Sequence, residues 1–184
     1  MARIRPLEYA EAGPPMRAEY DAQTATNGRV TNMKRTLAHS PVAFRALMQW
    51  YSLRDEVKPF LGERLTILFA HAISTQTDCL ICSTFFRRIL IESGEEPDGL
   101  RLDEREQTVV DYGRQLVRDA NRVSDELFGR LARHFQPREI VALTAFGGLM
   151  IATNVFNNAL RVDLDDYLTP YRETTEEWLI PNDE

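Results

Sequence analysis

Cys79 and Cys82, the only two cysteines of the chain, lie three positions apart in the stretch TQTDCLICSTFFRR. In a helix, residues three apart share a face, so the two sulfur atoms would be close enough to bond to each other. Thr77 and Asp78 are common helix-capping types, and we therefore expect a helix to begin at Cys79 and to run to Gly94. The free amide hydrogens and the positive dipole end of its exposed first turn would stabilise a thiolate.

A thiolate next to a second thiol has a defined redox chemistry. One sulfur attacks a peroxide O–O bond and becomes a sulfenic acid, and the second sulfur captures that acid as a disulfide. Asp78 opposes this chemistry, because a neighbouring carboxylate raises the pKa of a thiol. The helix end and Arg87 or Arg88 act in the opposite direction.

Two other interpretations of the cysteine pair stay open. Free cysteines are often buried as small apolar residues, so the pair could simply belong to the core. A closed zinc site needs four ligands, and the chain offers no second cysteine pair, while His39, His71 and His134 are scattered singly. We therefore expect no metal and no other cofactor.

Composition narrows the class of protein. With 184 residues the chain suits one domain, and its net charge of −6 repels nucleic acids and anionic membranes. The N-terminus has no apolar run of signal-peptide length, and the apolar stretch from Ile140 to Ile151 is shorter than the roughly 20 residues of a bilayer span. We expect a cytoplasmic protein without a nucleic-acid or membrane partner, and a buried helix at 140–151.

Apolar residues recur at helical spacing along the chain, and no segment alternates like a strand, which predicts an all-α fold. Residues 1–27 form an expected extended arm with a short helix, residues 28–162 a helical domain, and residues 163–184 an irregular tail. We expect a neighbouring surface or subunit to hold the arm, and Gly147 and Gly148 to admit close helix packing. Predicted helix starts are Ser40 before Pro41, the capping box of Asp103 and Glu106, Ser124, and Pro137.

Three segments carry a family resemblance: GRVTNMKRTLAHSPVAFRALMQWY, ERLTILFAHAISTQTDCLICS and FQPREIVALTAFGGLMIATNVFNNALRV. In this order they resemble the alkyl hydroperoxidase D (AhpD)/carboxymuconolactone decarboxylase superfamily over about residues 28 to 162, and the cysteine pair is similar to that of the hydroperoxidase branch. The resemblance implies an all-helical homo-oligomer, a dimer, trimer or hexamer, that reduces a peroxide substrate. It also implies re-reduction by a dithiol protein, lipoyl or thioredoxin-like.

The resemblance assigns Cys82 as the attacking and Cys79 as the resolving cysteine. At the positions of the family's glutamate and histidine, this chain has Ile67 and Phe86, so the usual proton relay is absent. Glu63 and His71 share a helix face with Ile67, each one turn of about 6 Å away. We hypothesise that His71 or Glu63 takes the proton from the attacking thiol. Alternatively, His71 is a core histidine and Glu63 favours a helix N-terminus.

Two alternative functions stay open, and several polar residues have expected places near the site. The chain could be a non-catalytic or redox-sensing member of this superfamily, or it could carry out lactone or decarboxylase chemistry in the same pocket. Asn154, Asn157 and Asn158 would line the pocket or stabilise a helix end and a subunit interface. Arg87 or Arg88 could lie near the mouth of a substrate site.

Overall fold

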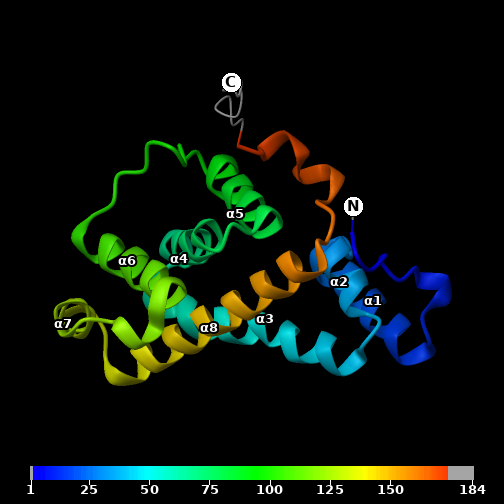
Figure 1. Cartoon of the computed structure of the whole chain (residues 1–184), viewed down its shortest axis with the longest axis horizontal. Coiled ribbons are helices and arrows are strands. Elements are labelled where there is room, and N and C mark those ends of the chain that lie inside the picture. Colours follow the sequence, from blue (N-terminus) through cyan, green and yellow to red (C-terminus); the bar gives the residue numbers. More distant parts are fainter. Residues whose placement is uncertain (1, 174–184) are drawn as a thin grey trace, which may run out of the picture.

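A computed structural model describes residues 2–173 of the chain, and the end of the expected C-terminal tail, residues 174–184, lies outside this part. Within the described residues there is no strand, and the predicted all-α fold is confirmed (Figure 1). Short 3-10 helices occupy Tyr9–Glu11, Ala120–Arg122 and Asp166–Tyr171, the last labelled η3 here. The α-helices are α1 (Pro14–Asn27), α2 (Asn32–Leu37), α3 (Pro41–Leu61), α4 (Glu63–Gln76), α5 (Leu80–Glu92), α6 (Glu104–Asp119), α7 (Asp125–His134) and α8 (Pro137–Leu160).

The predicted capping residues begin their helices. Ser40 accepts a hydrogen bond from the Ala43 amide at the start of α3, 3.3 Å away. At the start of α6, the Asp103 carboxylate accepts from the Glu106 amide at 2.8 Å, and the Glu106 carboxylate accepts from the Asp103 amide at 3.2 Å. These bonds satisfy amide hydrogens that have no partner within the helix. Hydrogen bonds between residues three positions apart therefore set where α3 and α6 begin.

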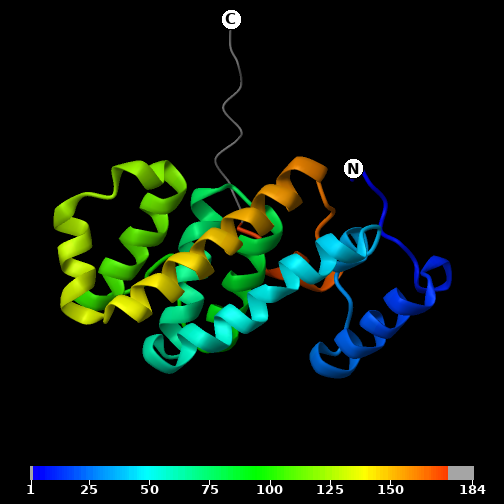
Figure 2. The same ribbon diagram turned by 90° about the horizontal axis from the view of Figure 1, so that it is seen from below.

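Helix α4 lies in the centre of the fold, in contact with α3, α5, α6 and α8. Its core side chains include Phe69 and Ile73, both fully buried. Figure 2 shows α3 and α8 running side by side as the two longest helices. By length and composition α8 would also suffice to cross a membrane, but Leu143, Phe146 and Met150 are buried in the core, as expected for residues 140–151. One face of α8 is therefore packed into the core, while Val141 and Val155 on the same helix are exposed.

Gly147 lets α8 approach two neighbours. A Cβ atom at this position would lie 2.8 Å from Leu116 and 3.0 Å from Phe69, closer than side-chain atoms pack. Gly148 faces no atom within 4 Å. The predicted close approach therefore depends on Gly147 alone.

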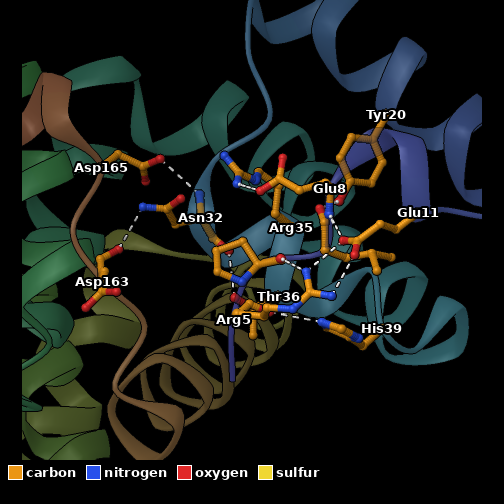
Figure 3. Close-up of polar contacts among 12 residues, drawn as sticks. Arg5, Glu8, Glu11, Tyr20, Asn32, Arg35, Thr36, His39, Asp163 and Asp165 are labelled. Carbon is orange, nitrogen blue, oxygen red and sulfur yellow. Dashed lines mark hydrogen bonds and ion pairs between the residues drawn. The ribbon is translucent and has the colours of Figure 1, made fainter. Parts of the chain in front are cut away.

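The N-terminal arm is held by its own chain (Figure 3). The Leu7 amide donates to the Arg35 carbonyl on α2 at 3.0 Å, and the Arg35 guanidinium forms an ion pair with Glu8. The Tyr20 hydroxyl donates to the Leu7 carbonyl at 2.6 Å. The expected short helix is the 14-residue α1, so the arm is more regular than the sequence pattern predicts.

The segment after α8 returns to the helical body. Its Asp165 carboxylate accepts from the Asn32 amide of α2 at 2.9 Å (Figure 3), and Leu168 of η3 is buried. η3 packs against α5 (Figure 1). Residues 163–173 therefore contain a 3-10 helix where an irregular tail is expected, and this helix helps to enclose the site described next.

Candidate functional site

The two cysteines lie at the junction of α4 and α5. Asp78 adopts a left-handed conformation with φ of 50°, its amide donates to Thr75, and the next amide, from Cys79, donates to the Ser74 carbonyl at 3.0 Å. This is a Schellman motif that ends α4, and Cys79 is at once its last residue and the N-cap of α5. The expectation that Thr77 or Asp78 caps the helix is wrong by one or two residues, because both are used to end α4.

Asparagines of α8 hold this junction from the other side. The Asn154 amide donates to the Thr77 hydroxyl at 2.8 Å, and the Asn158 amide donates to the Thr77 carbonyl at 2.8 Å. The side-chain nitrogen of Asn157 lies 3.3 Å from the Cys82 sulfur and 3.9 Å from the Cys79 sulfur. These asparagines therefore hold the cysteine junction. None of them lines the cavity described below, and their predicted role at a subunit interface stays a prediction.

Both cysteines are buried, which corrects the expectation of an exposed first turn. Cys79 is 0% exposed and Cys82 is 7% exposed, and both belong to the main hydrophobic cluster. The burial is due to α8, which covers the turn with Asn154 and Asn157, themselves 0% and 3% exposed. The thiols are nevertheless free and close together, since each one influences the proton affinity of the other.

The two thiols differ in acidity. A hydrogen bond from the Cys82 thiol lowers the pKa of Cys79 to about 7, against the effect of burial. Further contributions come from the backbone N–H groups of Cys82 and Ile81 and from the Asn157 amide, although none of these amides makes a regular side-chain cap bond. The hydrogen bond to Cys79 and burial raise the pKa of Cys82. Of the two sulfurs, Cys79 is therefore the one that ionises first, beside a protonated Cys82.

Cys82 opens onto a cavity of about 350 Å³, a volume suited to a small organic ligand. Residues from α1, α2, α3, α5, α8 and η3 line it, together with the loop before α2 and Asp165 just before η3. Cys79 does not reach it. Its apolar and aromatic walls include Leu47, Met48, Trp50, Tyr51, Ile81, Phe85, Phe86, Ile89, Met150, Tyr167 and Leu168.

The same cavity gathers positive charge. Four basic residues line it, against the single carboxylate of Asp165. Lys34 is 4% exposed, and its ammonium donates to the Tyr51 hydroxyl at 2.8 Å and to Gln23 at 2.5 Å. Burial lowers the pKa of Lys34 to about 8. The other three basic residues are Arg29, Arg54 and Arg88.

Neither proposed proton acceptor reaches the cavity. Glu63 is an exposed residue at the start of α4 and forms an ion pair with Lys58. His71 is partly buried and its Nε2 has no hydrogen-bond partner. Burial, together with the charges of Arg87 and Arg114, lowers its pKa to about 4. The structure thus brings Cys79 and Cys82 together but places Glu63 and His71 outside the lining of the site, and their proposed role stays a prediction without contacts to support it.

The two positions at which the resemblance expects a glutamate and a histidine hold apolar residues that pack in apolar surroundings. Ile67 is buried in the core, and Phe86 is a wall of the cavity. Arg88 lines the cavity, whereas Arg87 forms an ion pair with Asp98 at 2.6 Å. Among the described residues, no cluster of three or more histidine, cysteine or acidic side chains could hold a metal ion.

Sequence reasoning did not single out Lys34, Trp50 or Asp165. A signal for Lys34 existed, because it lies three positions before Leu37 and hence on the apolar face of α2. No local pattern could have found Asp165, which approaches the cavity only through the return of the chain after α8. The sequence also has no basic run, yet folding collects basic residues from three helices and a loop around one space.

The sequence matches no family model and no curated protein. Solved structures are similar in fold. The alkylhydroperoxidase AhpD core of an uncharacterized peroxidase-related protein from Ralstonia eutropha superposes with a TM-score of 0.70 at 20% identity, covering 91% of this chain and 94% of that one. A peroxidase-related protein from Silicibacter sp. gives a TM-score of 0.70 at 16% identity, with 89% and 93% covered.

A third similar structure is the debrominase Bmp8. Its apo form has a TM-score of 0.75 at 17% identity, with 91% of this chain and 95% of that chain covered. A cysteine-to-alanine variant of Bmp8 in complex with 2,3,4-tribromopyrrole gives 0.76 at 16% identity, with 91% and 94% covered. Together with the helix order and the buried cysteine junction, these likenesses show that the chain has the AhpD-like all-α fold.

Proposed function

We propose that the protein is a thiol-dependent peroxide reductase that uses Cys79 and Cys82 as a redox pair. The observation that carries the proposal is the hydrogen-bonded pair of cysteines of which one, Cys82, lines a cavity and is in reach of a ligand. The AhpD-like fold supports it, since two structures of that fold are named as peroxidase-related.

The arrangement suggests a route that needs neither Glu63 nor His71. As Cys82 attacks the O–O bond of a hydroperoxide ROOH, its proton passes to the Cys79 thiolate, its hydrogen-bond partner. The products are a Cys82 sulfenic acid, a Cys79 thiol and an alkoxide that water protonates. Cys79 then attacks the sulfenic sulfur, which forms the disulfide and releases one water molecule.

The cycle closes when a dithiol reduces the disulfide and is itself oxidised to a disulfide. We propose a dithiol protein, lipoyl or thioredoxin-like, for this step, and a homo-oligomer as the working form. Cytoplasmic location agrees with this chemistry, because free thiols persist in a reducing compartment.

Burial of both sulfurs favours a second candidate, a non-catalytic or redox-sensing protein. A third, thiol-driven removal of bromine from an aromatic ring, is suggested by Bmp8 and by the aromatic walls around Cys82. There, two thiols and an aryl bromide would yield a disulfide, the arene, bromide and a proton. Lactone or decarboxylase chemistry has no specific observation in its favour.

The test is peroxide consumption with dihydrolipoamide as the reductant, combined with intact-mass measurement. We expect turnover in the unmodified chain, a loss of two mass units on mild oxidation, and no turnover in Cys82→Ser. Two thiols that survive excess peroxide in the native protein would reject peroxidase activity and favour the non-catalytic reading. Bromide release from 2,3,4-tribromopyrrole, without peroxide turnover, would favour the dehalogenase.

A further inference from the structure

Lys34 is a buried cation whose described partners are all neutral. Its ammonium has three donors, of which two go to the Tyr51 hydroxyl and the Gln23 amide oxygen, at 2.8 and 2.5 Å. No carboxylate of the described chain forms an ion pair with it, and Asp165 acts on it only as a more distant charge. Burying an ammonium without a counter-charge is costly, so its third donor is well placed for an anion that enters the cavity.

Three arginines, Arg29, Arg54 and Arg88, add further positive charge to the lining of the cavity. Arg88 lies over the Tyr167 ring at 5.2 Å from its centre, and Arg29 lies over the same ring at 3.9 Å. Arg54 covers Trp50 at 5.5 Å. Arg54 also contacts Asp55, and Arg88 contacts Glu92, but neither of these carboxylates lines the cavity.

Asp165 limits this excess without cancelling it. One of its oxygens accepts from the Asn32 amide (Figure 3), while the other is buried without a hydrogen-bond partner. Burial raises the pKa of Asp165, which weakens its negative charge. Even fully ionised, it is one carboxylate among four cations in a protein of net charge −6. The basic character is therefore local to the cavity and opposite to that of the whole chain.

The remaining walls are mostly apolar and aromatic, with Asn27, Thr31 and Thr153 as polar members, and they include Cys82. We infer that the cavity binds an amphipathic organic molecule, with an aromatic or aliphatic body against these walls and a carboxylate on Lys34. This rests on the proposed function where the molecule is named as the substrate: an organic hydroperoxide that carries a carboxylate, with its O–O bond at Cys82. Hydrogen peroxide, which is small and neutral, uses none of these features.

Binding is tested without thiol chemistry, on the full chain carrying Cys82→Ser. The probes are 4-isopropylbenzoate and its neutral isostere 4-isopropylbenzamide, measured by isothermal titration calorimetry at pH 7. We expect the carboxylate to bind at least about tenfold more tightly, as for a hydrogen bond to a charged group. Equal affinities, or tighter binding of the amide, would overturn the inference.

The role of Lys34 is tested by Lys34→Met and Lys34→Gln in the same background, with folding checked by circular dichroism. Either folded variant should lose the preference for the carboxylate and keep the affinity for the amide. Lys58→Met is the matched control, because Lys58 is the only other lysine, is exposed and does not line the cavity. A preference that persists without the Lys34 charge would overturn the assignment of this residue.

Turnover gives an independent readout of the substrate class. With 4-carboxycumene hydroperoxide and its methyl ester as substrates, we expect kcat/KM to favour the acid, mainly through KM, and Lys34→Gln to abolish the difference. Binding without turnover of either compound would mean that the ligand inference holds and the peroxidase proposal fails. Turnover of both compounds at equal rates would mean that the peroxidase proposal holds and the ligand inference fails.

Discussion

The two faces of the α4–α5 pair present different chemistry. On the cavity face, Cys82 and Arg88 meet Lys34 and aromatic side chains of α2 and α3 around an open volume. Away from the cavity, His71 of α4 lies near the charges of Arg87 and Arg114, and its buried nitrogen has no hydrogen-bond partner. Lys34 and His71 are both basic groups whose pKa burial lowers, but only Lys34 lines a cavity together with a cysteine sulfur. Proximity to a ligand, and not an unusual pKa alone, distinguishes the functional candidate.

The side of α4 that contacts α6, which we call the α6 face, is instead closed by tight packing. A Cβ atom on Gly113 would lie 2.9 Å from Phe69, and one on Gly147 would meet Phe69 and Leu116. No ligand-sized space is left between these side chains. We therefore expect substitutions on the cavity face to change chemistry and those on the α6 face to change stability.

The largest effect is expected at the sulfur atoms. Cys82→Ser should reduce peroxide turnover by on the order of 10³-fold or more, since it removes the attacking atom. Cys79→Ser should also stop turnover, but a sulfenic acid should accumulate slowly on Cys82, detectable with dimedone and mass spectrometry. Ser83→Ala, on the same turn but outside the cavity lining, is the control. Dimedone labelling of Cys79 in Cys82→Ser would instead identify Cys79 as the attacking residue.

Next in size is a packing effect on the α6 face. Gly147→Ala should lower the free energy of unfolding by about 2 kcal/mol, because the new methyl group meets Leu116 and Phe69. Gly148→Ala is the matched control, with open space around it, and should stabilise the helix by up to about 1 kcal/mol. Urea unfolding measures both. Similar changes in the two variants would contradict the assigned packing.

A smaller effect is expected at Asn157, on the sulfur side of α8. Asn157→Leu removes an amide that lies 3.3 Å from Cys82 and that lowers the pKa of both thiols. The Cys79 pKa should rise, and alkylation at pH 7 should slow by about tenfold. Asn158→Leu is the comparison, since its amide binds the Thr77 carbonyl and no sulfur. An unchanged profile of alkylation rate against pH in Asn157→Leu would exclude this contribution.

The smallest effect is expected at His71. His71→Gln should leave peroxide turnover within about twofold, because the ring lies outside the cavity. Since the folded pKa, about 4, is below the ordinary value of 6.5, the unfolded chain binds the proton more readily between these values. The native protein should therefore lose about 1 kcal/mol of stability as the pH falls from 6.5 to 4, allowing for partial exposure. In His71→Gln, the free energy of unfolding should change less with pH over this range. A large loss of turnover in this variant would instead support His71 as the proton acceptor.

Helix identity and most helix starts were predictable because capping is local. Ser40, Asp103 and Ser124 act on amides within three residues, so the pattern contains both partners of each bond. The capping residue of α5 was mispredicted because Asp78 adopts a left-handed conformation that ends α4. The preceding residue, Thr77, accepts hydrogen bonds from Asn154 and Asn158, which are distant in the sequence.

Of the candidate site, only the pair of cysteines was predictable from the sequence. Spacing alone brings Cys79 and Cys82 onto one turn, and the amide end of a helix lowers a thiol pKa wherever it lies. The same spacing also aligned Glu63 and His71, correctly as a helix face, but could not tell which neighbour covers that face. In the fold Glu63 is exposed and pairs with Lys58, His71 is partly buried near the charges of Arg87 and Arg114, and the cavity lies elsewhere.

The sequence by itself determined the all-α class, the positions of most helices and the sulfur pair, because each depends on residues within about one helical turn of one another. Only the tertiary structure decided that the sulfurs are buried, that Cys82 and not Cys79 meets a cavity, and that Lys34 is its buried cation. These properties arise where α2, α3, α5, α8 and η3 converge, and burial and local charge depend on which distant segments exclude water from the same space.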